Sequence, residues 1–188
     1  MRKILLTAIA ALALASCQEV TYPLVHQAVI DHVQAQVGQD AKLTIREIRT
    51  ADSLTMGQLY DQRIKAFNTK LSQDTKLYEK YKGQKMEANA AKHKKAIEKD
   101  KAILKGLEAM APDIASISDV VVCYDVNFSG QAKTPELTTV FDNYWAAVTV
   151  GGVVLSTNNE LRGLHKGFGK FIPGYSDLLH KVGDEDAN

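Results

Sequence analysis

The chain has 188 residues, with 23 basic and 22 acidic side chains and a formal net charge of +1 at pH 7. This near-neutral balance lacks the basic excess of a nucleic-acid-binding domain, so we expect no nucleic-acid partner. The length suits one domain of ordinary size that can bury a hydrophobic core, and we assign residues 23–183 to it.

The N-terminal segment is short, basic at its start and then apolar. Arg2 and Lys3 precede an apolar run over residues 4–14, interrupted only by Thr7. A mature membrane-spanning helix needs roughly 20 apolar residues, so this run is too short to be one. The order of basic residues, apolar run and small residues is typical of a secretory signal peptide.

The end of this segment, Leu-Ala-Ser-Cys at residues 14–17, resembles the lipobox of bacterial lipoprotein precursors. The resemblance implies that residues 1–16 are removed as a signal peptide by cleavage between Ser16 and Cys17. It also implies that Cys17 carries the lipid, including fatty acyl chains such as palmitate. The alternative is an ordinary secretory signal in which Cys17 is incidental.

Lipidation of Cys17 would make residues 17–22 a tether and the membrane a partner of the protein. Gln18, rather than Asp, follows the cysteine. Under the enteric sorting rule, that residue implies transport to the outer membrane. Cys123 would then be the only free thiol, so no intrachain disulfide could form. Because Cys123 lies in an apolar strand pattern, we expect it to be buried.

The first elements of the domain are a helix and a strand. Pro23 suits a first helical turn, and valines recur every four residues up to Gly38, a natural stop. Residues 42–49 alternate apolar and polar side chains with one change of phase, which predicts a strand with a bulge. Residues 50–53 should end that strand, and Asp52 or Ser53 should cap the next helix.

Residues 54–111 are rich in Lys, Gln, Glu and Ala, with apolar residues at the 3-4 spacing of packed helices. Pro112 should end this region. If the chain reverses near Gly83, the two polar residues on the apolar seam, Asp74 and His93, face each other. This favours an antiparallel helical hairpin over one continuous helix.

The remaining sequence predicts strands. We expect them at residues 120–128, 138–150 and 153–155, with turns at Ser129–Gly130 and Gly151–Gly152. A short helix should follow near residues 176–181, and an acidic tail covers residues 184–188.

The predicted fold class is α+β: an N-terminal helix packed on an antiparallel sheet of about four strands, with an inserted antiparallel hairpin at residues 54–111. This element order resembles cystatin-like and NTF2-like domains. The resemblance implies a sheet wrapped on a helix, and it carries no functional residue.

Candidate catalytic chemistry is sparse. Cys123 could pair with a histidine as a nucleophile, but nothing in the sequence selects the histidine. Asp74 and His93 are interpreted as a polar pair that fixes the hairpin register, rather than as part of a catalytic triad. Zinc-binding spacings such as HExxH do not occur. We therefore predict a protein that is not an enzyme, with no metal and no cofactor.

The leading hypothesis is a lipid-anchored, non-enzymatic envelope protein that binds another component. Residues 63–108 contain 13 basic residues and only 6 acidic ones. This Lys-rich hairpin is either a solvated surface or a contact for an envelope protein, lipid headgroups or lipopolysaccharide. The alternative is a small-ligand domain with a pocket under the sheet, lined by Tyr144, Trp145, Phe168 or Tyr175. An unrecognised hydrolase ranks last.

Overall fold

The computed structural model describes residues 23–183, so the predictions for the signal peptide, the tether and the acidic tail lie outside the described residues. The elements are α1 (Pro23–Val37), β1 (Lys42–Thr55), α2 (Met56–Gly83), α3 (Glu87–Ala115), β2 (Val121–Lys133), β3 (Thr138–Val148), β4 (Val154–Asn158), α4 (Leu161–Leu164), the 3-10 turn η1 (Phe168–Phe171) and α5 (Tyr175–Val182). This arrangement confirms the predicted α+β class, with its leading helix and its inserted helical hairpin.

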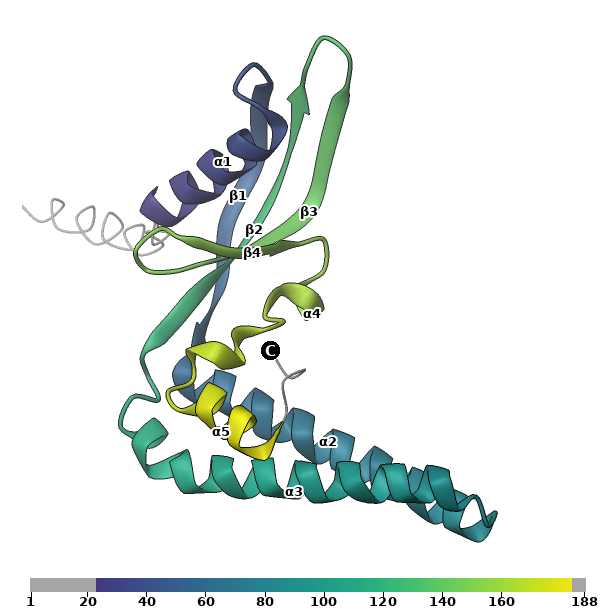
Figure 1. The fold of residues 1–188 in the computed structure, drawn as a ribbon. Helices are drawn as coiled ribbons and strands as arrows, with labels where there is room; N and C mark the ends of the chain where they lie inside the picture. Colours follow the sequence, from purple (N-terminus) through teal and green to yellow (C-terminus); the bar gives the residue numbers. More distant parts are fainter. Residues whose placement is uncertain (1–22, 184–188) are drawn as a thin grey trace, which may run out of the picture.

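The four strands form one antiparallel sheet in the order β1-β2-β3-β4, and α1 lies across one face of it (Figure 1). Val25, Val29 and Val33 of α1 are buried against this sheet. The four-residue repeat of valines therefore gives α1 its inward face.

β1 is longer than the sequence predicts. It continues past residue 49 to Thr55, with register shifts at 45–47 and at 50–52. Residues 50–53 therefore contain a bulge and do not end the strand, because pairing with β2 continues on both sides of it. The cap also differs from the prediction: the Thr55 side chain accepts from the backbone of Gln58 and completes a capping box.

Ser129–Gly130 is likewise not a turn, because β2 runs through it to Lys133. Gly130 lies beside a register shift in β2 and pairs with Ile45 on one side and Phe141 on the other. A Cβ at this position would lie 2.5 Å from the Thr44 carbonyl oxygen and 3.1 Å from the Ile45 Cα. The glycine is needed because the β1 backbone approaches this closely.

We expect Gly130→Ala to lower the free energy of unfolding by about 1–3 kcal/mol, since the clash is with backbone that cannot rotate away. Urea unfolding followed by circular dichroism measures it. Gly83→Ala is the matched control, because a Cβ there meets nothing within 4 Å. An unchanged urea midpoint for Gly130→Ala would show that β1 and β2 can move apart to fit the added methyl group without loss of stability.

The α2–α3 hairpin reverses near Gly83, as the two apolar seams predict. His93 Nδ1 lies 2.8 Å from Asp74 Oδ1, and the His93 ring stacks on Tyr81. The second helix does not end at Pro112 but continues to Ala115. Pro112 has no N–H and therefore removes one i→i−4 hydrogen bond, but the helix continues past it and its last turn buries Ile114 in the core.

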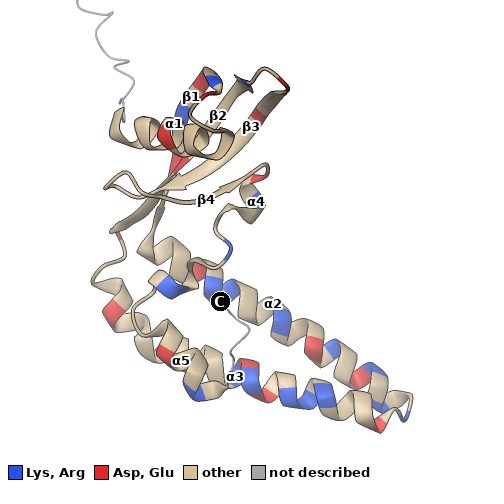
Figure 2. Cartoon of the chain, turned by 45° about the horizontal axis from the view of Figure 1, so that its top comes forward, with Lys and Arg blue, Asp and Glu red and all other residues tan. Residues whose placement is uncertain are grey.

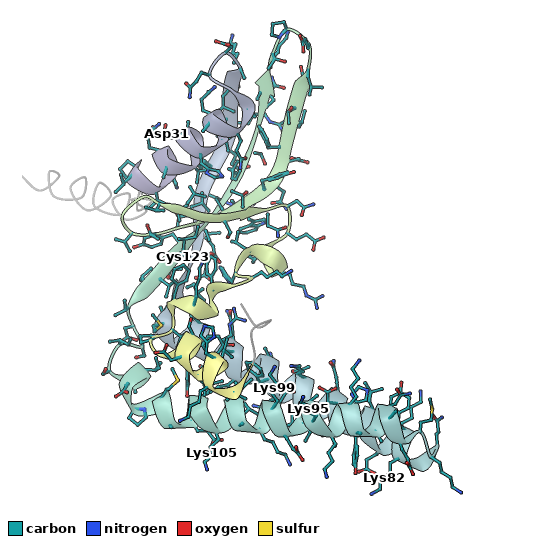
Figure 3. The ribbon with its side chains drawn as sticks, in the orientation of Figure 1. Asp31, Lys82, Lys95, Lys99, Lys105 and Cys123 are labelled. Carbon is teal, nitrogen blue, oxygen red and sulfur yellow. The ribbon has the colours of Figure 1, made fainter. Side chains whose placement is uncertain are left out.

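The molecule has the shape of an L, with the sheet as one arm and the hairpin as the other (Figure 1). A second hydrophobic core fills the corner, where Leu59, Ile103 and Leu107 pack with residues of α5 and η1. The far part of the hairpin extends beyond this core and carries mixed charges with many lysines (Figure 2). Figure 3 places Lys82 near its tip.

Candidate functional site

An open concavity of the described residues lies at the inner corner of the L. It is an open cleft of about 820 Å³ between the end of β1, the start of β2, the start of α2 and the α4 loop. Its lining residues are Asp52, Ser53, Leu54, Gln58, Asp61, Gln62, Arg63, Lys65, Asp125, Leu161, Arg162, Gly163, His165, Lys166 and Gly167.

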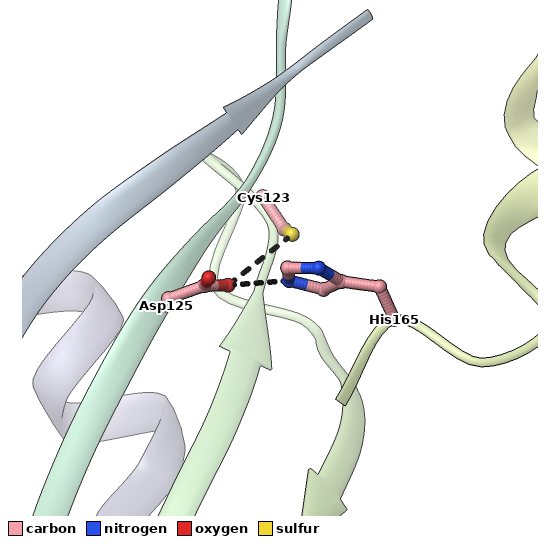
Figure 4. A group of neighbouring side chains, drawn as sticks. All are labelled: Cys123, Asp125 and His165. Atoms are coloured by element: carbon pink, nitrogen blue, oxygen red, sulfur yellow. Dashed lines mark hydrogen bonds and ion pairs between the residues drawn. The ribbon is translucent and has the colours of Figure 1, made fainter. Parts of the chain in front are cut away.

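A cluster of three polar side chains lies where the sheet borders this cleft: Cys123, Asp125 and His165 (Figure 4). Cys123 and Asp125 are two residues apart on β2, and alternation along a strand places both on the same face. His165 comes from the loop after α4. All three offer a donor atom within 4.8 Å of the others.

The hydrogen bonds of the cluster converge on one carboxylate oxygen. His165 Nε2 lies 2.8 Å from Asp125 Oδ1, and the Cys123 thiol donates to the same oxygen at 4.0 Å. A nucleophilic triad needs the imidazole between the nucleophile and the acid, so that one ring nitrogen serves each. Here the carboxylate occupies the middle position, and the geometry does not activate the thiol.

The environment of Cys123 also opposes nucleophilic chemistry. The side chain is completely buried, in agreement with the sequence-based expectation. Burial, together with the negative charge of Asp125, raises the pKa of the Cys123 thiol to about 12. The reactive thiolate is therefore scarce at neutral pH.

We expect Cys123 in the metal-free native protein to resist iodoacetamide at neutral pH and to react fully once the protein is unfolded in urea. Mass spectrometry of the intact protein measures the modified fraction. Val153→Cys supplies an exposed thiol as a positive control, since Val153 is an exposed turn residue. Rapid native modification of Cys123 would mean that its surroundings open to solvent.

The walls of the cleft carry charges of both signs. Asp52 and Asp125 are register partners on β1 and β2, so the sheet wall is acidic. The helical walls are mainly basic: α2 contributes Arg63 and Lys65 beside one acidic residue, Asp61, while Arg162 lies on α4 and Lys166 just after it. A solute held between these walls would meet cations from two separate elements.

The cleft is not the pocket that the sequence predicts. Phe168 and Tyr175 are buried in the corner core, and neither Tyr144 nor Trp145 lines the cleft. Asp74 and His93 also lie outside its lining, on the hairpin. Sequence reasoning missed Asp125, for which the Cys-x-Asp alternation within β2 is one weak signal, and it could not select His165 from His26, His32 and His180 as the partner of Cys123.

Comparison with known proteins identifies the N-terminal signal. Residues 1–18 match the family model of the prokaryotic membrane lipoprotein lipid attachment site. No curated protein and no solved structure matches the chain, so the likeness to cystatin-like and NTF2-like domains stays a prediction. Within residues 23–183, no helix is both long and apolar enough to cross a bilayer.

These findings define the class of protein. The chain is a bacterial lipoprotein precursor, anchored in the cell envelope through a lipid-modified cysteine. The match covers the attachment signal, and the role of the folded domain is a separate question.

Proposed function

We propose that the folded domain binds a small solute carrying an anionic group, held in the corner cleft at the membrane surface. The observation that carries the proposal is the cleft itself, whose volume of about 820 Å³ lies in the usual range of small-molecule sites. Basic side chains on α2 and around α4 would bind the anionic group, and the acidic sheet wall would accept hydrogen bonds from its donors.

Inorganic phosphate is the probe for this cleft. We expect Arg162→Ala and Lys166→Ala each to weaken phosphate binding by roughly tenfold, because a hydrogen bond to a charged group is worth about 1.5–3 kcal/mol. Isothermal titration of the lipidated protein in detergent gives the affinities. Native mass spectrometry of protein extracted from its own membranes detects a retained solute.

Lys82→Ala is the matched control for this experiment, because it removes one cation near the hairpin tip, away from the cleft. Equal weakening by Lys82→Ala would show that phosphate responds only to overall charge. An absence of both phosphate binding and a retained solute would remove the support for a ligand site.

A second function, as an interaction arm, is supported by the projecting hairpin. Its net basic charge suits an acidic surface on an envelope protein (Figure 2). The exposed apolar stripe that a tight protein contact favours is missing from the described hairpin, where Met86 is the only large hydrophobic residue that is strongly exposed. Crosslinking in native envelopes tests this arm by comparing the unaltered protein with the Lys82→Glu, Lys95→Glu double variant. Equal yields of crosslinked partner from the two proteins would refute the interaction.

We assign the protein to the outer membrane because Gln18, and not Asp, follows the lipidated residue. Density-gradient separation of the two membranes tests this location. Gln18→Asp should move the protein to the inner-membrane fraction, and recovery of the unaltered protein there would contradict the assignment.

A further inference from the structure

The Cys123, Asp125 and His165 side chains combine a thiol, a carboxylate and an imidazole, three of the ligand types that bind zinc. They come from two chain segments about forty residues apart and meet at the edge of the cleft. Two of them, Asp125 and His165, also line the cleft, which gives an ion a route of entry.

The burial of Asp125 is the second observation. Asp125 is only 5% exposed, and among the described residues it forms one ion pair, with His165. Buried carboxylates in proteins are normally paired with a positively charged side chain or coordinate a metal ion. No lysine or arginine side chain fills that role for Asp125 in the described structure.

We propose that Cys123, Asp125 and His165 bind a divalent transition-metal ion, with zinc as the best fit, and leave a fourth position open toward the cleft. A tetrahedral zinc ion holds such ligand atoms roughly 3.2–3.6 Å apart. The present separations of 2.8 Å and 4.0 Å from Asp125 Oδ1 bracket that range. His165 directly follows α4 and lies two residues before Gly167, on a loop in which a small shift would make the adjustment.

This inference deepens the proposed function, because an anionic solute in the cleft would reach the open metal position. Three protein ligands with one open position is the arrangement of zinc sites that act on or hold a ligand, whereas purely structural sites are closed by four protein ligands.

Titration with Co²⁺ and Zn²⁺ tests the site, using the lipidated full chain after treatment with a chelator. We expect one ion per chain and a near-ultraviolet thiolate-to-cobalt band. Cys123→Ser should abolish the band, and Asp125→Asn and His165→Asn should each weaken Zn²⁺ binding by at least roughly tenfold. Circular dichroism of each variant verifies that it is folded.

His180→Asn is the matched control, since His180 lies on α5 and outside the cluster. Binding without the thiolate band, or with unchanged affinity in Cys123→Ser, would overturn the site. Arg162→Ala separates the two proposals, because it should weaken phosphate binding and leave Zn²⁺ binding intact. Retained phosphate binding without Zn²⁺ binding would refute the metal site alone.

An independent observation concerns the membrane. Leu24, Val150 and Val153 are 59%, 56% and 59% exposed, although all three are large aliphatic side chains. Leu24 lies at the start of α1, and its side chain comes within 3.3 Å of the position that a Cβ on Gly152 would occupy. The start of α1 and the 149–153 turn thus form one apolar patch.

The position of this patch identifies what covers it. The tether before Pro23 consists of the six residues 17–22 alone, beginning with the lipidated Cys17. Six residues span at most about 20 Å when fully extended, so the start of α1 stays close to the bilayer. We infer that Leu24, Val150 and Val153 rest in the surface of the bilayer that holds the Cys17 lipid. The hairpin projects toward the opposite side of the molecule (Figure 1).

A nitroxide label tests this orientation on vesicles of phosphatidylethanolamine and phosphatidylglycerol. The label is attached through Val153→Cys in the lipidated protein, where Cys17 is blocked by lipid and Cys123 is buried. It should collide more with dissolved oxygen than with a water-soluble nickel chelate. The same label at Lys82→Cys should show the reverse preference, and equal chelate access at both positions would overturn the orientation.

Discussion

Cys17→Ala should move the protein from the membrane fraction to the soluble periplasmic fraction and abolish its labelling by radioactive palmitate. The lipid attachment signal covers residues 1–18, in which Cys17 is the only cysteine, so we expect this cysteine to be the acceptor. Each buried methylene of an acyl chain contributes about 0.8 kcal/mol, and stable anchoring needs more than one chain. The three exposed aliphatic residues at the start of α1 and in the 149–153 turn are too few to replace the lipid.

Cys123→Ser is the matched control for this experiment, because it removes the other cysteine and leaves the attachment signal unchanged. It should label with palmitate and sediment with membranes as the unaltered protein does. Persistent palmitate labelling of Cys17→Ala would show that the lipid is attached elsewhere, contrary to the anchoring assignment.

Leu107→Ala should lower the free energy of unfolding by roughly 2–5 kcal/mol, the range for removing a fully buried leucine. The Leu107 side chain is completely buried in the core that joins the hairpin to the C-terminal segment. The Tyr60 hydroxyl donates to the Leu107 carbonyl at 2.6 Å, and the substitution leaves that backbone bond available. The loss therefore reports side-chain packing.

Urea unfolding followed by circular dichroism measures the effect, with Lys105→Ala as the control on the same helix. Lys105 is exposed, so its substitution should change stability by no more than about 0.5 kcal/mol. Similar losses for the two variants would mean that the corner core contributes little, and that the two arms of the L are held by other contacts.

Prediction from sequence succeeded where the signal is local and periodic. The valine repeat of α1 and the paired seams of α2 and α3 depend on helical spacing, which is visible along the chain. The reversal at Gly83 followed because two polar residues interrupt the two seams at matching distances from it. Helix periodicity is the most readable signal in this sequence.

Prediction failed at the strand ends. Residues 50–53 and Ser129–Gly130 have turn-like composition, yet both lie inside long strands where the register shifts. A bulge and a turn favour similar small or polar residues, so composition does not separate them. Pairing between β1 and β2 decided the outcome, because that pairing holds the chain extended through both segments.

The sequence by itself determined that the protein is attached to the membrane through a lipid, because a lipid attachment signal is a linear motif that is recognised before the chain folds. It also determined the helical hairpin and the unpaired state of Cys123. Only the tertiary structure decided the candidate site. It brings β2 and the loop after α4 together at one corner, so that Asp125 meets both Cys123 and His165. Contacts between segments so distant in the sequence depend on how the sheet and hairpin pack, and no local pattern encodes them.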